Sequence, residues 1–328
     1  MIIPSYIGVI SKNKLFDGGN GSIENPYRIV KSYHFDNMRR FPTASYSQEN
    51  DLVFTDEFEP DGEYYNNGNL WLPVPGNFTG RYNGNGYKIE NLKSVPQGNQ
   101  RGAFFTTLGG VIENLYLKNI WVSNTSLRFI ASIAGNSSAL SLIQNVFVDG
   151  QILAGWNSAG ILGRSSGGTI RRCGVNITLR GSNVQGGIFA GSSSTIHIHD
   201  SYSRGTMTNL LYHRGGIMGS TFGARLYRCY STINMRGSNN HLSRGLISTY
   251  DGYNATQENS YWDREATGTA SSFAGGIAMF TTQAKYPYGL INDELPYQNW
   301  DFDNVWAHDV DGTINDGYPY LRNVTPIN

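Results

Sequence analysis

The chain lacks long apolar stretches and an excess of charge of either sign. No segment of its 328 residues approaches the roughly 20 consecutive apolar residues that a membrane-spanning helix needs, so we expect no membrane insertion. Residues Met1 to Tyr6 lack the basic start of a secretory signal, and the apolar run that follows ends by Ser11. We therefore expect either a leader removed before Met1 or export by another route, such as release in a virus particle. The N-terminal methionine favours the second.

Carboxylates are scarce in the middle of the chain. Residues 102–250 contain twelve basic residues, eleven of them arginine, against Glu113, Asp149 and Asp200, a net charge of +9 in a chain whose total charge is zero. Carbohydrate-cleaving sites commonly need two carboxylates about 5–10 Å apart, and these three fall at different positions of the repeat described below. We therefore assign no catalytic residue and favour a protein that is not an enzyme. The basic section suggests an anionic partner, but without a recognition motif nucleic acid is not predicted.

Glycine and tyrosine, in contrast, are abundant, with 40 and 21 residues, and they follow a repeat. Units of about 28 residues run from about Gly102 to Asp263, each with a glycine-rich bend and a stretch of alternating apolar and polar residues. One polar position, the anchor, recurs at intervals of 31, 27, 28, 28 and 31 residues, at Asn114, Asn145, Arg172, Asp200, Arg228 and Asn259. The glycines disfavour helices, the alternation is typical of strands, and a propeller blade needs about 40 residues or more.

The sequence therefore predicts an all-β fold, a single-stranded β-solenoid (right-handed β-helix) of about six to seven coils. Residues 77–263 are assigned to the solenoid. Residues 1–76 form an N-terminal lead and cap with a turn-rich start, and residues 264–328 form a C-terminal cap. Within the N-terminal part, a short helix is predicted at about residues 35–40, and the acidic, aromatic residues 42–76 are predicted to be irregular.

If each unit is one coil, equivalent residues stack about 4.8 Å apart in rows. The row that follows the anchor is small or apolar and should point inward: Leu115, Val146, Cys173, Ser201, Cys229 and Ser260. Its two cysteines lie two coils apart, too far for a disulfide, so both are expected to be free and buried. The next row should point outward: Tyr116, Phe147, Gly174, Tyr202, Tyr230 and Tyr261. This aromatic row is either a structural stack, which we favour, or a binding platform.

Several segments resemble one known family. Residues 16–29 resemble its turn-rich start, residues 78–92 are similar to its "F-x-G-x-x-x-GNG-x-x-I-x-NL" entry coil, and the units are similar to its "GG-x-x-G…I-x-x-CYS-x-G" repeat. Ser260-Tyr261-Trp262-Asp263 resembles its "SYWD" terminator, and Gly317-Tyr318-Pro319-Tyr320-Leu321 its closing segment. The family is the GLUG-type glycine-rich repeat proteins of bacterial surfaces and their phages. The resemblance covers about residues 16–322 and implies a β-solenoid, with adhesion as the expected function.

Edge loops are the usual place for binding on a solenoid, because their variation leaves the stack undisturbed. The edge before each glycine-rich bend combines an aromatic residue with Asn, His and Arg, which suits a sugar ring with acidic substituents. The candidate binding residues, expected to neighbour one another on successive coils, are Trp156, Asn183, Leu210, Leu211, Tyr212, His213, Arg214, His241 and Arg244. Variable loops without a binding role are the alternative.

No metal or cofactor is predicted. His197 and His199 share one strand face, but no third zinc ligand is evident near them. The acidic loop with Asp309, Asp311 and Asn315 has calcium-like spacing but lacks a bidentate glutamate, so an ordinary turn is favoured.

The sequence favours a non-catalytic adhesin, a phage tail receptor-binding protein located in the virion, that contacts a bacterial surface glycan or outer-membrane protein through the edge loops. Other virion tail proteins are the expected further partners, and a homo-oligomer stays open. A polysaccharide-degrading tail spike is one alternative. It would need acidic residues from 42–76, or Asp251, Glu258 and Asp263, to lie over the coils. A bacterial cell-surface structural or adhesion protein is the other.

Overall fold

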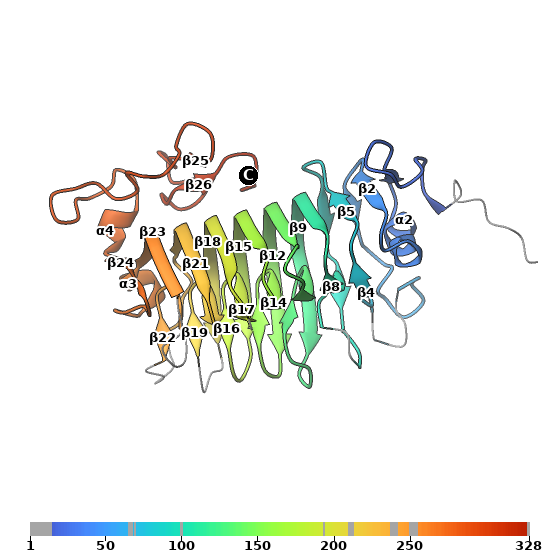
Figure 1. Ribbon diagram of the computed structural model, residues 1–328, viewed down its shortest axis with the longest axis horizontal. Coiled ribbons are helices and arrows are strands. Elements are labelled where there is room, and N and C mark those ends of the chain that lie inside the picture. The colour runs from blue at the N-terminus through green and yellow to red at the C-terminus, as the bar shows by residue number, and fades with distance from the viewer. Residues whose placement is uncertain are drawn as a thin grey trace, which may run out of the picture.

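The computed structural model describes residues 15–64, 68, 70–98, 101–192, 194–208, 213–236, 242–248 and 255–326. Stacked parallel strands form an elongated solenoid through most of this chain (Figure 1). Its longest strands are consecutive turns of one sheet, the long sheet: β9 (Val111–Asn124), β12 (Leu142–Ala154), β15 (Thr169–Arg180), β18 (Ile196–Thr208), β21 (Ala224–Ser231) and β23 (Ala255–Asp263). These six strands confirm the predicted all-β solenoid, with about six turns.

Each turn continues from the long sheet into two shorter sheets. The corner sheet consists of two-residue strands: β10 (Ile130–Ala131), β13 (Ser158–Ala159), β16 (Gln185–Gly186), β19 (Arg214–Gly215) and β22 (Ser243–Arg244). The back sheet consists of β4 (Val74–Phe78), β8 (Phe105–Leu108), β11 (Ala134–Ser137), β14 (Leu162–Ser165), β17 (Phe189–Ser192) and β20 (Met218–Ser220). Every strand pair within these three sheets is parallel, as expected when each unit is one winding.

The anchor row is where each long strand bends. All six anchors have a left-handed backbone, with φ between 46° and 52°. Asparagine adopts this conformation readily, and the first two anchors form a ladder: Asn114 Nδ2 donates to Asn83 Oδ1 (3.0 Å), and Asn145 Nδ2 donates to Asn114 Oδ1 (2.8 Å). The repeat therefore recurs because each coil needs the same bend at the same place.

The predicted inward rows are confirmed. Val146 pairs in register with Leu115 and with Cys173, and Ser201 pairs with Cys229, so the two cysteines lie in one row two coils apart. Both cysteines are free and buried, and burial raises the pKa of each thiol to about 12, so neither is a reactive thiolate at neutral pH.

The N-terminal part continues the same sheet. Strands β1 (Tyr27–Ile29), β2 (Ser45–Gln48) and β5 (Arg81–Asn83) lie in order before β9. Shorter strands β3 (Leu52–Val53), β6 (Lys88–Glu90) and β7 (Lys93–Ser94) also join it. The predicted helix is present as α2 (Ser32–Asn37) and the 3-10 turn η1 (Met38–Arg40), and its buried Phe35 packs near Trp71 and Phe104.

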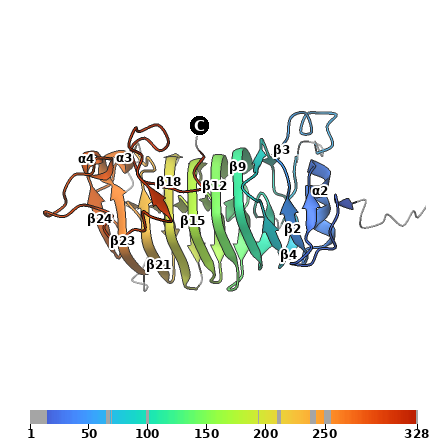
Figure 2. The same ribbon diagram turned by 90° about the horizontal axis from the view of Figure 1, so that it is seen from above.

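The C-terminal part folds back over the outside of the long sheet. After α3 (Arg264–Thr267), β24 (Gly275–Met279) and α4 (Thr281–Ala284), residues 285–326, the C-terminal segment, return toward the middle of the solenoid; β25 (Trp306–Ala307) and β26 (Tyr320–Leu321) form a small antiparallel pair within it. In both Figure 1 and Figure 2 the C-terminus lies over the region of β12 and β15. No helix in the described part of the chain is long and apolar enough to span a membrane.

Candidate functional site

The aromatic row stands on the outer face of the long sheet in the predicted register. Phe147 pairs with Tyr116 and Gly174, and Tyr202 pairs with Tyr230. The rings of Tyr202 and Tyr230 are parallel, with centroids 5.1 Å apart. Most of the row is nevertheless buried, because the C-terminal segment, together with the ends of β24 and α4, covers it with a second apolar cluster: Met279, Ala284, Tyr297, Trp300, Val305, Trp306, Tyr318 and Leu321. The structural stack is therefore the correct interpretation for Tyr202, Tyr230 and Tyr261.

Hydrogen bonds hold the C-terminal segment, which is the cover of the aromatic row, in place. The Tyr230 hydroxyl donates to the Pro319 carbonyl (2.7 Å), and the Tyr202 hydroxyl lies 2.9 Å from Thr325 Oγ1. Asn315 is buried among them, and its amide donates to the Tyr230 hydroxyl (2.6 Å). The C-terminal segment is thus fixed to the solenoid by hydrogen bonds as well as by ring packing.

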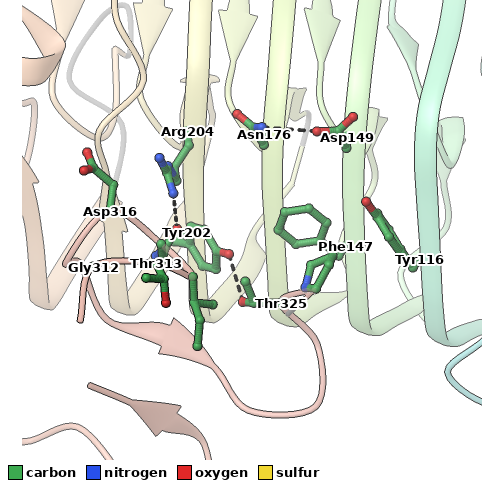
Figure 3. A pocket seen from close by; sticks show the side chains of 13 residues that line it. Tyr116, Phe147, Asp149, Asn176, Tyr202, Arg204, Gly312, Thr313, Asp316 and Thr325 are labelled. Atoms are coloured by element: carbon green, nitrogen blue, oxygen red, sulfur yellow. Dashed lines mark hydrogen bonds between the residues drawn. The ribbon is translucent and has the colours of Figure 1, made fainter. Parts of the chain in front are cut away.

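A cleft of about 340 Å³ opens where the C-terminal segment ends on the aromatic row (Figure 3). This volume lies in the range of about 300–1,000 Å³ that is usual for small-molecule sites. One wall comes from the long sheet and the other from the C-terminal segment. The lining residues are Tyr116, Phe147, Asp149, Asn176, Tyr202, Arg204, Gly312, Thr313, Ile314, Asn315, Asp316, Thr325 and Pro326.

The aromatic wall of the cleft is partly exposed. Tyr116 is half-buried and meets Phe147 edge-on, with ring centroids 5.5 Å apart. The rings of Phe147 and Tyr202 lie over Gly174. A Cβ at position 174 would lie only 2.8–2.9 Å from both rings, so the position has no room for a side chain. Burial, and secondarily the negative charges of Asp149 and Glu90, raise the pKa of Tyr116 to about 12. Its phenol is therefore a protonated hydrogen-bond donor at neutral pH.

A polar row runs beside the aromatic one. Asp149, Asn176 and Arg204 are in register on β12, β15 and β18. Asn176 Nδ2 donates to Asp149 Oδ2 (3.1 Å), and the Arg204 guanidinium donates to Asn315 Oδ1 of the cover (Figure 3). The cleft thus combines rings with a carboxylate, an amide and a phenol, groups that bind a polyhydroxylated ligand without reacting with it.

The other carboxylates of the coils have structural partners. Buried Glu113 pairs with Arg81 and accepts from Gln144 (2.7 Å), and Asp200 accepts from Arg228 Nη2 (2.8 Å). The C-terminal Asp316 contributes to the cleft but pairs with Lys285 (2.7 Å). Among the described residues, no group of three His, Cys, Asp or Glu side chains is placed to hold a metal ion.

The acidic loop with calcium-like spacing is held together by backbone hydrogen bonds to one of its carboxylates. Asp309 is buried and accepts the backbone N–H groups of Asn315 (2.7 Å), Gly317 (2.8 Å) and Ile314 (3.2 Å). Burial by itself would raise the pKa of Asp309, but these donors outweigh it and hold the pKa below the usual 3.8. Asp309 therefore shapes the loop that forms one wall of the cleft.

The candidate edge residues lie at the corners between the long sheet and the corner sheet. Trp156 and Asn183 are neighbours there: the Asn183 N–H donates to the Trp156 carbonyl (3.1 Å). Trp156 is 43% exposed, and the Arg128 guanidinium lies 4.5 Å from its ring centre. Leu210, Leu211, Tyr212 and His241 lie outside the described residues.

Two of the edge residues point elsewhere than predicted. Arg214 is only 1% exposed and His213 only 9%, so neither presents its side chain on the surface; His213 Nδ1 lies 3.5 Å from Ser248 Oγ. Both belong to the solenoid interior because their corner turns them inward. Arg244 is half-buried, and its Nη1 donates to the Ser243 carbonyl (3.1 Å).

The cleft was not predicted from the sequence. Two features of the sequence are related to it: the outward tyrosine row and the many aromatic residues between Tyr286 and Tyr320. Neither feature alone indicates that the second covers the first, because that contact joins segments more than one hundred residues apart, such as Tyr202 and Thr325.

The chain is similar in sequence to parts of two longer proteins. No protein-family model matches it, so membership of the GLUG-type family stays a prediction. A "Putative Gly-rich membrane protein" of Evansella cellulosilytica is 30% identical over 146 residues, 42% of this chain and 16% of that protein. "Halomucin" of Haloquadratum walsbyi is 27% identical over 93% of this chain and 3% of its own length. The chain thus spans a small part of both relatives.

One solved structure has a similar fold. It is the crystal structure of a "putative immunoglobulin A1 protease" from Bacteroides ovatus, with a TM-score of 0.70 over 94% of this chain and 96% of that one, at 20% identity. At this level of identity the likeness establishes the shared solenoid fold and no activity.

Proposed function

We propose that the chain is a non-catalytic adhesion module of an extracellular surface, and that it binds a glycan in the cleft beside Tyr116. The observation that carries this proposal is the combination, in one cleft, of the half-buried Tyr116 ring, packed beside Phe147, with a carboxylate and an amide on the adjoining row. Rings pack against the apolar face of a sugar, while Asp149 and Asn176 exchange hydrogen bonds with its hydroxyl groups.

The arrangement of charges supports binding without cleavage. A glycosidase holds two carboxylates on opposite sides of the scissile bond. In this cleft the solenoid supplies Asp149, and the second carboxylate, that of Asp316, is already paired with Lys285. Of the other carboxylates on the coils, Glu113 and Asp200 are bound by arginines, and Glu90 pairs with Lys88 and Lys118.

We also propose the kind of surface to which the module belongs. Similarity to a Gly-rich membrane protein and to a halomucin favours an extracellular setting. The narrower hypothesis rests on the sequence alone: a phage tail receptor-binding protein in the virion, with tail proteins and a bacterial surface receptor as partners. Antibody labelling of purified phage particles and of intact cells distinguishes a virion adhesin from a bacterial cell-surface adhesin.

Binding to an array of bacterial surface polysaccharides tests the site. We expect the double variant Tyr116→Ala, Asp149→Ala to lose at least tenfold in affinity for the polysaccharides that the unmodified protein binds. Trp156→Ala is the matched control at the edge. If Trp156→Ala loses binding while the cleft variant retains it, the ligand is held at the corner loops and the cleft assignment is wrong.

Incubation with the same polysaccharides tests the absence of catalysis. We expect no release of reducing ends above that of a heat-denatured sample. Turnover that Asp149→Asn abolishes would instead establish the degrading tail spike and place its catalysis in this cleft.

A further inference from the structure

A row of polar side chains lies inside the solenoid at the corner sheet. Ser158, Gln185, Arg214 and Ser243 are in register on β13, β16, β19 and β22, so neighbouring members are about 4.8 Å apart along the stack. Ser158 and Gln185 are fully buried and Arg214 is 1% exposed. In the preceding coil the same position is Ile130, so the row changes from apolar to polar toward the C-terminus.

This polar row has few hydrogen-bond partners. Arg214 Nη1 donates a long bond to the Met207 carbonyl (3.4 Å), which places the guanidinium in the corner between the end of β18 and β19. Among the described residues, the remaining buried polar atoms of the row have no partner: Arg214 Nε and Nη2, both amide atoms of Gln185, and the hydroxyls of Ser158 and Ser243. Buried donors are normally satisfied, so the unpartnered N–H groups of Arg214 and of Gln185 on the adjacent coil call for an acceptor near both.

The charge of Arg214 is also without a counter-ion in the described structure. Burial lowers the pKa of Arg214 to about 10, with no acidic side chain acting against it, so the guanidinium still carries its charge at neutral pH. Neither residues 209–212 nor residues 237–241, which precede the strands of this corner, contain an acidic residue. An isolated buried cation is strongly unfavourable, whereas a cation paired with an anion is tolerated.

We infer that the Arg214 corner is a binding site for a small monovalent inorganic anion of the size of chloride, held by the Arg214 guanidinium together with the Gln185 amide and the Ser243 hydroxyl of the two neighbouring coils. A monovalent ion balances the single buried cation, whereas phosphate or sulfate would leave a second charge buried and unpaired. The near-complete burial of the corner excludes a bulky carboxylate ligand. The site lies beneath the corner loops that carry Trp156 and Asn183, so the anion stabilises that edge from within.

Thermal unfolding of the full chain tests the site. Chloride is titrated at constant ionic strength against gluconate, an anion too large for the corner. We expect the Tm to rise by about 2 °C for each tenfold increase in chloride above the Kd. Arg214→Met, of similar length but uncharged, should abolish this rise. Arg225→Met, which removes an exposed arginine of β21, should retain it.

Crystals of the unmodified protein grown with bromide give a second test that does not depend on a variant that folds. We expect an anomalous peak within about 3.5 Å of Arg214 Nε or Nη2. A corner that contains only water, or bromide peaks confined to the surface, would overturn the proposal. A Tm that does not change with chloride but falls in Asp251→Asn would also overturn it, because the counter-ion of Arg214 would then be a carboxylate of the chain itself.

Discussion

The two halves of the solenoid differ in two of their inward rows and in what covers their outer face. In the coils of β9, β12 and β15, the two inward rows that flank the aromatic row contain Leu115, Leu117, Val146 and Val148, all buried. In the later coils the same rows contain mainly serine (Ser201, Ser203, Ser231 and Ser260), while the outward tyrosines are buried under the C-terminal segment. Apolar residues such as Ile198, Ile217 and Leu226 still fill the inside of the later coils, and the buried tyrosine cluster adds a second apolar layer on their outer face. The cleft lies at the boundary, where the outer cover ends.

Glycine packing explains why the later coils use serine. Gly187 faces Ser203 and Gly216 faces Ser231, and a Cβ added at either glycine would lie 2.6 Å from the serine Cβ. The backbones approach so closely that a branched apolar side chain has no room. The serine hydroxyls form hydrogen bonds instead: Ser203 Oγ donates to the Gly216 carbonyl (2.6 Å). The outer tyrosine cluster adds apolar burial to these coils beyond that of their inner core.

Removing the outer cover should have the largest effect. Trp306 is fully buried between the C-terminal segment and the tyrosine row, and Trp306→Ala should lower the free energy of unfolding by about 3–5 kcal/mol in urea titrations. In hydrogen exchange, β18 and β21 should lose protection more than β9 and β12, because only the later coils depend on the cover.

Trp156→Ala is the matched control, since this tryptophan is exposed. It should change the free energy of unfolding by only about 0.5 kcal/mol. Equal loss of protection in all coils of Trp306→Ala would show that the outer cluster does not stabilise the later half in particular.

Substitutions in the inner rows should have the next largest effect on the free energy of unfolding. Leu117→Ala in the early half should lower the free energy of unfolding by about 2–5 kcal/mol, because it leaves a cavity in a fully buried site. Ser203→Ala, in the same row three coils later, should cost about 1–3 kcal/mol, the effect of a lost hydrogen bond to the Gly216 carbonyl. Chemical denaturation of both variants measures the difference. A larger loss in Ser203→Ala would contradict an interior whose late rows are held by polar contacts.

Much of this architecture follows from the repeat alone. The register of Cys173 and Cys229, the inward rows and the outward aromatic row are consequences of period two within a strand and one coil per unit. The left-handed anchors were not foreseen, because only half of them are asparagine and arginine rarely adopts that backbone. The repeat predicted the spacing of the anchors but not the left-handed bend that each of them forms.

The site was less accessible from the sequence. Arg214 was predicted on the surface because it directly precedes a glycine-rich bend at the solenoid edge, whereas the structure buries its side chain at that corner. The cover over Tyr230 depends on contacts such as the hydrogen bond from Asn315, 85 residues further along the chain. Periodicity describes neighbours within the stack, so it contains no information on a segment that folds back across it.

Acid should release the cover before it unfolds the coils. The folded-state pKa of Asp309 is depressed, so its contribution is complete above the pKa of the unfolded chain and is lost as the pH falls through the lower folded value, below 3.8. We expect tryptophan fluorescence to report this change below that pH. Asp309→Asn should lower the free energy of unfolding by about 1.5–3 kcal/mol already at neutral pH, and its tryptophan fluorescence should depend less on acid. An unaltered acid transition in Asp309→Asn would assign it to other carboxylates.

The smallest expected effect concerns the anchors, where the halves also differ. The early anchors form an asparagine ladder, and the next position is Arg172, a residue that tolerates its left-handed backbone poorly (φ 51°). Arg172→Asn relieves this strain and places an amide where it can donate to Asn145, so it should raise the free energy of unfolding by about 0.5–1 kcal/mol. The reverse change, Asn145→Arg, should lower it by a similar amount. Urea titrations measure both, and a destabilised Arg172→Asn would mean that the charged anchors of the later half contribute more than the backbone strain costs.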